Sequence, residues 1–355
     1  MKNLKFLTFF FLQFLIINPT VAKTTENIDE SFYIPVQESE LFVRVSGNLN
    51  KPLIIYLHGG PGGFSTLEHE LYKNNLEQDY LIAYFDQRGC GQSKKETDTY
   101  RLNIENYIKD LEKVIVVLSK KYGKEKVNLM GESWGGTYGL LYLLKDQSKV
   151  STMITNGGVA NAPYAYYNLI QKERVLTNKL LKATTDPDQI KKYKHIIKEL
   201  ERIEKSDFDH FFNDMNLIKH TFPELLNFNP YRVKPQNGPP SKEVLEDCNI
   251  DMETLLSFFP KGEYVNKAFR NQSSYNNLNI LDKISDIKIP VLVIQGEKDY
   301  SVGINQAKLM YKALNKEYSE NKHLEIIKNA GHSTTGEQPG ITIPIIKQFL
   351  DNYNK

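Results

Sequence analysis

Short apolar runs recur along the chain, and each one ends near a glycine or a polar loop. They are rich in β-branched and aromatic residues and show no strict alternation with polar ones, which is typical of strands buried on both faces of a mostly parallel sheet. A helical pattern separates two of these runs most clearly at residues 103–122, where Gly123 follows as a stop signal. The alternation predicts an α/β fold. The runs lie at residues 31–36, 41–47, 52–57, 80–85, 126–130, 151–156, 290–295 and 324–329.

Residues 161–278 interrupt this alternation, because they contain helical patterns and a Pro-rich loop but no clear strand. Strands and helices alternate again from residue 279 to the end. A helical block between two halves of one α/β pattern indicates an insertion that covers a single sheet. We therefore expect a core made of residues 23–160 and 279–355, with a helical cap at 161–278.

The first 22 residues have the features of a signal peptide. Lys2 and Lys5 precede an apolar run from Phe6 to Ile17, and small residues near Ala22 suit a cleavage site. The run is shorter than the ~20 apolar residues that a membrane span needs, so an uncleaved anchor is the weaker alternative. We expect cleavage near Ala22 and a secreted or periplasmic protein with no membrane attachment afterwards.

The charge of the chain and the motifs that it contains limit the classes of partner that we expect. Without Lys2 and Lys5 the 45 basic residues fall to 43, which equals the number of acidic residues, so nothing favours nucleic acid or an anionic membrane. The two cysteines, Cys90 and Cys248, make no disulfide framework, and no C-x-x-C or H-E-x-x-H metal motif occurs. We expect a short peptide or small-molecule substrate and neither a metal nor a cofactor.

One serine lies between glycines at the end of an apolar run. The sequence Gly131-Glu132-Ser133-Trp134-Gly135 follows the run at 126–130 and precedes an apolar helical pattern. This strand, sharp turn and helix is the context of a nucleophile elbow, in which glycines allow the tight bend. The alternative is a glycine-rich turn without chemistry. We predict that Ser133 is a catalytic nucleophile.

A serine nucleophile needs a base and an acid, and both follow in the expected order. The run at 290–295 leads to Asp299, and the run at 324–329 leads to His332. Loops at the carboxyl ends of parallel strands are where α/β sheets bind ligands. Glu297 is the rival acid, and we prefer Asp299 because its position beyond the strand lets its carboxylate reach across to an imidazole.

The segment His58-Gly59-Gly60-Pro61-Gly62-Gly63 follows another strand. Its glycines let backbone amides approach a developing oxyanion, so we predict an oxyanion hole formed by the N–H groups of Gly60 and Trp134. We expect His58 to brace this loop. A phosphate loop is disfavoured, since no G-K-[ST] ending follows the glycines.

These motifs together resemble the α/β-hydrolase superfamily, and more narrowly its proline iminopeptidase family. The resemblance rests on "HGGPGG", "DQRGCGQS", "GESWGGT", "GEKD" and "AGHS", which occur in the expected order. It implies an α/β-hydrolase fold with a mostly parallel eight-stranded sheet and an inserted helical cap. It also implies a Ser133, Asp299 and His332 triad that releases an N-terminal residue through an acyl-enzyme. Asp86 and Arg88 are expected to brace loops beside the site through an ion pair.

The substrate prediction meets two departures from the family pattern. Glu132 stands where relatives carry glycine, and Trp134 is the only tryptophan, whereas many prolyl enzymes have a Trp-rich cap segment ending in glutamate. Cap carboxylates that could replace that glutamate at the substrate amine are Glu173, Glu204 and Glu224. The leading prediction is a serine aminopeptidase that favours proline. The alternatives are a broader ester, amide or lactone hydrolase and a non-catalytic binding protein.

Overall fold

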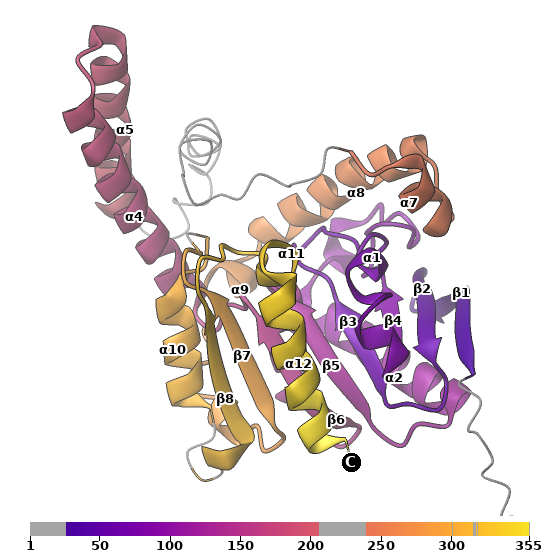
Figure 1. Ribbon diagram of the computed structural model, residues 1–355. Helices are drawn as coiled ribbons and strands as arrows, with labels where there is room; N and C mark the ends of the chain where they lie inside the picture. Colours follow the sequence, from indigo (N-terminus) through magenta and orange to yellow (C-terminus); the bar gives the residue numbers. More distant parts are fainter. Residues whose placement is uncertain (1–25, 206–238, 300, 315–316, 318, 355) are drawn as a thin grey trace, which may run out of the picture.

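The computed structural model describes residues 26–205, 239–299, 301–314, 317 and 319–354 (Figure 1). The expected signal peptide and Glu224 lie outside these residues. No helix in the described part of the chain combines the length and apolar character that a membrane span requires.

One eight-stranded sheet forms the centre of the molecule, which confirms the predicted fold class. Its strand order is β1-β2-β4-β3-β5-β6-β7-β8. The pairs β1–β2 and β2–β4 are antiparallel, and every other neighbouring pair is parallel. The strands are β1 (Asn27–Val36), β2 (Ser39–Asn48), β3 (Leu53–Leu57), β4 (Leu81–Phe85), β5 (Val127–Glu132), β6 (Val150–Asn156), β7 (Val291–Gly296) and β8 (Lys322–Ile327).

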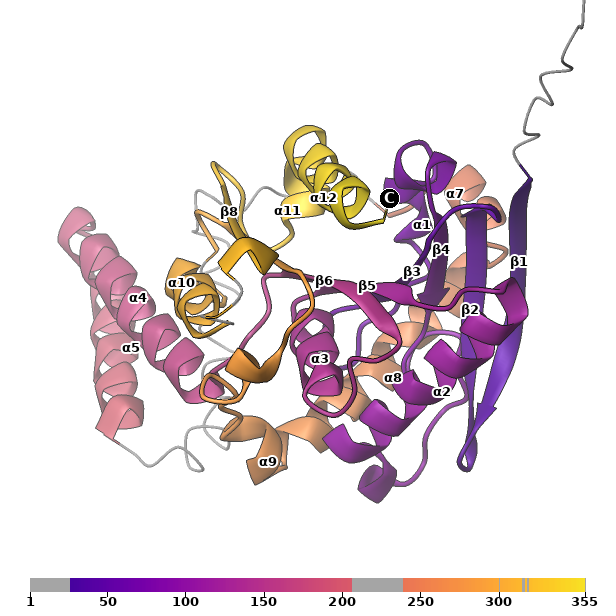
Figure 2. The ribbon, with the colours of Figure 1, turned by 90° about the horizontal axis from the view of Figure 1, so that it is seen from below.

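Helices cover both faces of this sheet (Figure 2). One face carries α2 (Ile104–Tyr122), α3 (Trp134–Leu143) and α10 (Ile304–Ala313), whose apolar side chains belong to the larger core cluster. The other face carries α1 (His69–Tyr72) and α12 (Pro339–Tyr353), whose side chains belong to the second cluster. The short α11 (Thr334–Glu337) precedes α12.

Strand β3 shows why the sheet is apolar throughout. Leu53, Ile55 and Leu57 point into the larger cluster, while Ile54 and Tyr56 point into the second one. Successive strand residues face opposite sides, so a strand covered by helices on both sides must be apolar at every position. This explains why the apolar runs do not alternate with polar residues.

Helix α2 begins and ends where its sequence predicts. The Asn103 side chain accepts a hydrogen bond from the Asn106 N–H, which satisfies a free amide of the first turn. Gly123 ends the helix in the left-handed conformation with φ 64°.

Between β6 and β7, five α-helices occur in the residues that the structure describes. They are α4 (Ala162–Ala183), α5 (Pro187–Lys205), α7 (Lys242–Asp247), α8 (Met252–Arg270) and α9 (Ser273–Asn276). In Figure 1, α4 and α5 form a projecting hairpin, and α8 lies above the edge of the sheet. Asn161 and Asn279 pair in an isolated bridge, so the chain leaves the sheet region and returns to it at adjacent points.

Candidate active site

Ser133 lies in a strained turn between β5 and α3. Its backbone has φ 51° and ψ −120°, a conformation that costs a non-glycine residue about 1–3 kcal/mol. The Ser133 N–H donates to the Asn156 carbonyl at 2.7 Å, which holds the turn against β6. Both flanking glycines are required, because a Cβ on Gly135 would lie 1.9 Å from the Leu57 oxygen and one on Gly131 would lie 2.3 Å from Gly135 backbone atoms.

His332 and Asp299 form a direct contact beside this turn. The His332 Nδ1 lies 2.8 Å from the Asp299 Oδ2. The Asp299 side chain is fully buried, whereas the His332 side chain is 35% exposed. A Cβ on Gly157 would lie 3.2 Å from His332 Cε1, so this glycine makes room for the imidazole. His332 and Ser133 line the same cavity.

Four hydrogen bonds orient the Asp299 carboxylate. Besides the contact with His332, its Oδ2 accepts from Gln295 Nε2 at 2.6 Å, and its Oδ1 accepts from the N–H groups of Ser301 and Val302 at 2.8 and 3.1 Å. Glu297, the rival acid, is exposed, and its carboxylate accepts from the Asn329 N–H instead. The structure therefore brings Asp299, and not Glu297, to His332.

The surroundings of Asp299 and His332 shift the pKa values of both groups in directions that favour an ion pair between them. Burial would raise the pKa of Asp299, but the hydrogen bond and charge of His332 outweigh it and hold that pKa below its ordinary value. Burial would lower the pKa of His332, but the hydrogen bond and charge of Asp299, with the charges of Glu132 and Glu337, raise it above its ordinary value. An imidazolium formed during a reaction would be stabilised here.

A pH profile tests the contribution of Glu132. A general base must be neutral, so kcat/KM should rise with pH as His332 loses its proton. Removing the Glu132 charge in Glu132→Gln removes one cause of the raised His332 pKa, and the acid limb of the profile should move to lower pH. The control is Glu297→Gln, which should leave the limb in place. A limb that stays fixed or moves to higher pH in Glu132→Gln would contradict this assignment.

The loop after β3 approaches the serine closely. A Cβ on Gly59 would lie 3.3 Å from Ser133 Cβ. His58 braces the loop as expected, because its Nε2 accepts from the Gln87 N–H at 2.9 Å and its Nδ1 lies 2.8 Å from the Gly59 carbonyl oxygen. Burial lowers the pKa of His58, so the neutral ring donates from Nδ1.

The expected oxyanion-hole residues border the same space as Ser133. Gly60, with φ 130°, and Trp134 both line the cavity around the serine. Trp134 is the first residue of α3, where backbone N–H groups lack partners within the helix. Its side chain is held by a 3.0 Å hydrogen bond from Nε1 to Gln87 Oε1.

The cavity has a volume of about 170 Å³ and lies between the serine turn and the cap helices. Pockets for drug-sized ligands occupy roughly 300–1,000 Å³, so this one suits a group the size of an amino-acid residue. Tyr166 and Tyr275 supply aromatic walls. In the described part of the chain, Arg270 is the only Asp, Glu, Lys or Arg among its lining residues.

Of the three cap carboxylates proposed for the amine, only the side chain of Glu173 is described by the structure, and it is not among these lining residues. Glu173 lies on α4, is 6% exposed, has an Oε2 without a hydrogen bond, and burial raises its pKa to about 7. Glu204 belongs to α5, but its side chain lies outside the described residues, as does all of Glu224.

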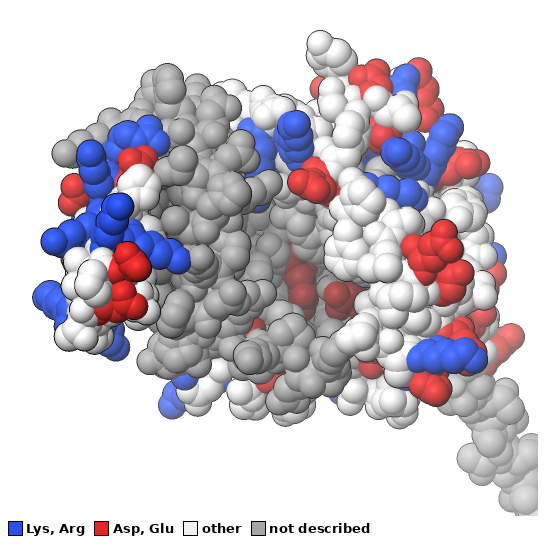
Figure 3. Space-filling model, turned by 90° about the horizontal axis from the view of Figure 1, so that it is seen from above, with Lys and Arg blue, Asp and Glu red and all other residues white. Residues whose placement is uncertain are grey.

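Two neighbouring carboxyl groups, those of Glu68 and Glu132, interact near the serine turn. Glu132 is partly buried and accepts from Asn156 Nδ2 at 3.2 Å. Burial and the neighbouring Glu132 charge raise the pKa of Glu68 to about 8. Figure 3 shows that the face above the sheet is hollowed and that acidic side chains lie within the hollow. Sequence reasoning noticed Glu132 but missed Glu68, since nothing in the sequence places residue 68 near residue 132.

The loop that contains Asp86 and Arg88 is not held by the ion pair that we expected. Arg88 does not pair with Asp86. Instead it makes two 2.8 Å hydrogen bonds to Asp110 of α2, whereas Asp86 accepts from the backbone N–H groups of Ser65 and Gln92. The expected ion pair was wrong because a carboxylate of α2, distant in sequence, lies closer to the guanidinium.

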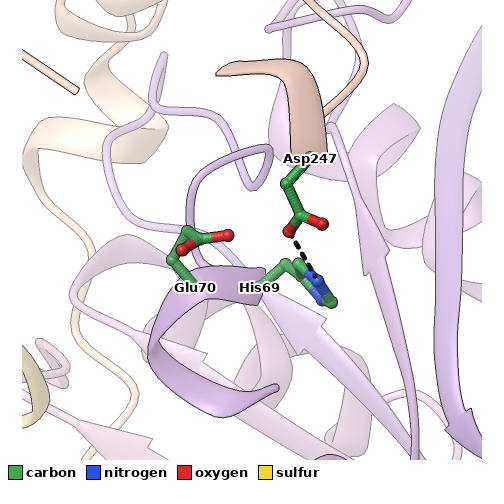
Figure 4. A group of neighbouring side chains, drawn as sticks. All are labelled: His69, Glu70 and Asp247. Carbon is green, nitrogen blue, oxygen red and sulfur yellow. Dashed lines mark ion pairs between the residues drawn. The ribbon is translucent and has the colours of Figure 1, made fainter. Parts of the chain in front are cut away.

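One group of side chains has the composition of a metal site. His69 and Glu70 on α1 and Asp247 on α7 could each offer a ligand atom within 4.8 Å of the others (Figure 4). However, the Lys73 ammonium lies 2.7 Å from Glu70 and 3.2 Å from Asp247. The ammonium offsets one of the two carboxylate charges and contacts both groups, so Lys73 connects α1 to α7 at this point.

Two family models match the chain. One is described as alpha/beta hydrolase fold and matches residues 52–176. The other is described as prolyl oligopeptidase family and matches residues 245–354. The first includes the loop after β3 and the serine turn, and the second includes Asp299 and His332. Each match thus contains a different part of the candidate site.

Curated relatives and solved structures agree with these matches. The chain is 25% identical to a proline iminopeptidase of Saccharolobus solfataricus over 87% of either chain. It is also 25% identical to a proline iminopeptidase of Thermoplasma volcanium over 91% of this chain and 97% of that one. The crystal structure of proline iminopeptidase from Mycobacterium smegmatis matches with a TM-score of 0.62 at 16% identity and covers 92% of this chain and 99% of that chain. The last likeness concerns the fold alone.

Proposed function

We propose that this chain, which has the α/β-hydrolase fold, is a serine aminopeptidase that releases an N-terminal residue, with proline favoured, from short peptides. The observation that carries this proposal is the 2.8 Å contact between His332 and the buried Asp299 at the edge of the cavity that contains Ser133. The proline iminopeptidases among the relatives support the substrate class.

The proposed reaction assigns one step to each of these groups. His332 Nε2 takes the proton of the Ser133 hydroxyl as its oxygen attacks the carbonyl carbon of the first residue. The N–H groups of Gly60 and Trp134 donate to the oxyanion. The imidazolium then gives its proton to the leaving amine, and an acyl-enzyme remains on Ser133. A water molecule, deprotonated by His332, releases the residue in the second half of the reaction.

Acetylation of the substrate amine is the most direct test of aminopeptidase activity. A protonated amine near the reacting carbonyl needs a carboxylate partner, because an unpaired buried charge costs several kcal/mol. Our candidates are Glu173, which does not line the described cavity, and Glu204 and Glu224, whose side chains lie outside the described residues. We expect prolyl arylamide to be cleaved and its N-acetyl derivative to be cleaved far more slowly, by more than the roughly 200-fold that a lost apolar contact can give.

Alanyl and leucyl arylamides serve as controls for the shape of the pocket. The cavity of about 170 Å³ between Trp134, Tyr166 and Tyr275 supports a small first residue, so the leucyl substrate should be slower than the prolyl one. If N-acetyl-prolyl arylamide or a simple p-nitrophenyl ester turns over as fast as free prolyl arylamide, the broader ester, amide or lactone hydrolase is the correct function. That alternative is supported by the lack of Asp or Glu among the described residues that line the cavity.

We also propose export from the cell, on the pattern of residues 1–22. The mature protein should begin near Lys23 and be found outside the cytoplasm. N-terminal sequencing of protein from the producing cell tests this. A soluble cytoplasmic form that retains Met1 would contradict it.

A further inference from the structure

We propose that Arg270 binds a carboxylate of the substrate, which makes the enzyme selective for substrates that carry a negative charge near the scissile bond. In a peptide this charge is the C-terminal carboxylate of a dipeptide. The proposal deepens the proposed function and rests on it for the identity of the substrate.

Arg270 lies in the last turn of α8 and lines the cavity that contains Ser133 and His332. Its backbone carbonyl accepts from Asn276 Nδ2 at 2.9 Å. Its guanidinium makes no hydrogen bond or ion pair with any residue that the structure describes. A group with five N–H donors thus faces the reaction space with its bonding capacity unused.

The other arginines of the described chain are bonded differently. Each of them donates to a side-chain oxygen of another residue, and in most cases that oxygen belongs to a carboxylate. The pairs are Arg44–Asp29, Arg88–Asp110, Arg101–Glu96, Arg174–Gln171 and Arg202–Glu199. Arg270 is the exception among the described arginines, and it is the one that lines the site.

Helix α8 holds Arg270 in a defined position. The helix packs backbone against backbone on the loop after β3, since a Cβ on Gly62 would lie 2.2 Å from the Gly262 oxygen. Asn266, one turn before Arg270, donates to the Pro61 carbonyl at 3.0 Å, and Gln272, just beyond it, donates to the Leu102 carbonyl at 2.6 Å. A guanidinium on a helix segment that is held by contacts before and after it loses little freedom when it binds a ligand.

The surroundings of Arg270 favour a carboxylate as the ligand. The cavity walls near it include the aromatic rings of Trp134, Tyr166 and Tyr275, and a guanidinium binds a carboxylate through two parallel hydrogen bonds that strengthen when water is excluded. Because the cavity is only about 170 Å³, the carboxylate must lie within a few bonds of the carbonyl that Ser133 attacks. The C-terminus of a dipeptide meets this requirement.

A purely structural role is the competing explanation. A cation in the last turn of a helix stabilises that helix through its dipole, and Arg270 would then be needed for folding but not for substrate choice. The two roles differ in one measurable quantity, the preference between a substrate with a carboxylate and its neutral amide.

The experiment compares kcat/KM for prolyl-alanine and prolyl-alanine amide in the wild type and in Arg270→Ala. Charge-assisted hydrogen bonds of this kind correspond to about 10- to 100-fold in affinity, so the wild type should prefer the free carboxylate by about that factor. Arg270→Ala should bring the ratio close to one, and Arg270→Lys should restore part of it. Lys267→Ala removes an exposed charge from the same helix and should keep the wild-type ratio.

A second substrate pair identifies the source of the carboxylate. Prolyl-aspartic acid amide and prolyl-asparagine amide differ only in a side-chain charge. If the wild type prefers the aspartic acid substrate and Arg270→Ala removes this preference, the result supports recognition of a carboxylate. In that case the carboxylate is that of the side chain and not that of the C-terminus. If the wild type shows no preference in either pair, or if Arg270→Ala lowers both members of a pair equally, the proposal is wrong.

Prolyl arylamide separates this result from a failure of the proposed function. If the wild type cleaves no prolyl arylamide or prolyl peptide, the aminopeptidase proposal fails, and Arg270 is then tested with the p-nitrophenyl monoester of succinic acid against p-nitrophenyl butyrate. A wild-type preference for the succinate ester that Arg270→Ala abolishes supports carboxylate binding by Arg270 with a different substrate. Equal turnover of the two esters contradicts it.

Discussion

Ser133→Ala is expected to lower kcat by about 10³-fold or more, with little change in KM. The substitution removes the oxygen that attacks the carbonyl, so only binding and oxyanion stabilisation remain, as they do in other serine hydrolases that lose a triad member. Steady-state kinetics on prolyl arylamide measures the effect. Turnover by Ser133→Ala at the wild-type rate would show that another residue is the nucleophile.

Ser133→Gly serves as the control for folding. Ser133 is held at φ 51° and ψ −120°, a conformation that glycine adopts more easily than serine or alanine. The glycine variant should therefore be as inactive as Ser133→Ala but at least as stable in thermal unfolding. If it is both inactive and clearly less stable than Ser133→Ala, the loss of activity cannot be assigned to the missing hydroxyl alone.

Asp299→Asn is expected to lower kcat by up to about 10⁴-fold. The carboxylate accepts the Nδ1 proton of His332 and leaves Nε2 free to take a proton from Ser133. An asparagine amide can donate to Nδ1, which places the ring proton on Nε2 and blocks that transfer. Kinetics on the same substrate measures the loss, and KM should change little because Asp299 is buried away from the cavity.

Glu297→Gln is the matched control for this variant. It makes the same chemical change two residues away, in the same loop, on a carboxylate that contacts Asn329 and not His332. It should retain activity within about twofold. Equal losses in Asp299→Asn and Glu297→Gln would indicate that the loop as a whole, and not the acid at position 299, supports the reaction.

The sheet could be predicted from the sequence because its strands are buried on both faces. Continuous apolar runs such as 53–57 and 81–85 have no other stable placement, and the helix signals at Asn103 and Gly123 are local. The position of Arg88 shows the limit of this reasoning. Its partner Asp110 lies 22 residues away, and a choice among several carboxylates depends on how α2 packs.

In the candidate site, too, some residues could be predicted from the sequence and others could not. Ser133, Asp299 and His332 each follow a strand at the same edge of the sheet, so their sequence positions alone suggest that they meet. The cap residues carry no such constraint. Glu173 was predicted from its charge, but it does not line the described cavity, whereas Arg270 lines it without having been considered. Which face of a cap helix meets the core depends on contacts that no short motif records.

A fluorophosphonate probe tests directly whether Ser133 is a nucleophile activated by His332. It reacts with the serine itself, so the result does not depend on the natural peptide. The wild-type protein should take up one equivalent of the probe, peptide mass spectrometry should place the adduct on Ser133, and His332→Ala should react far more slowly. Labelling at another residue, or equal labelling of the wild type and Ser133→Ala, would show that Ser133 is not the activated nucleophile.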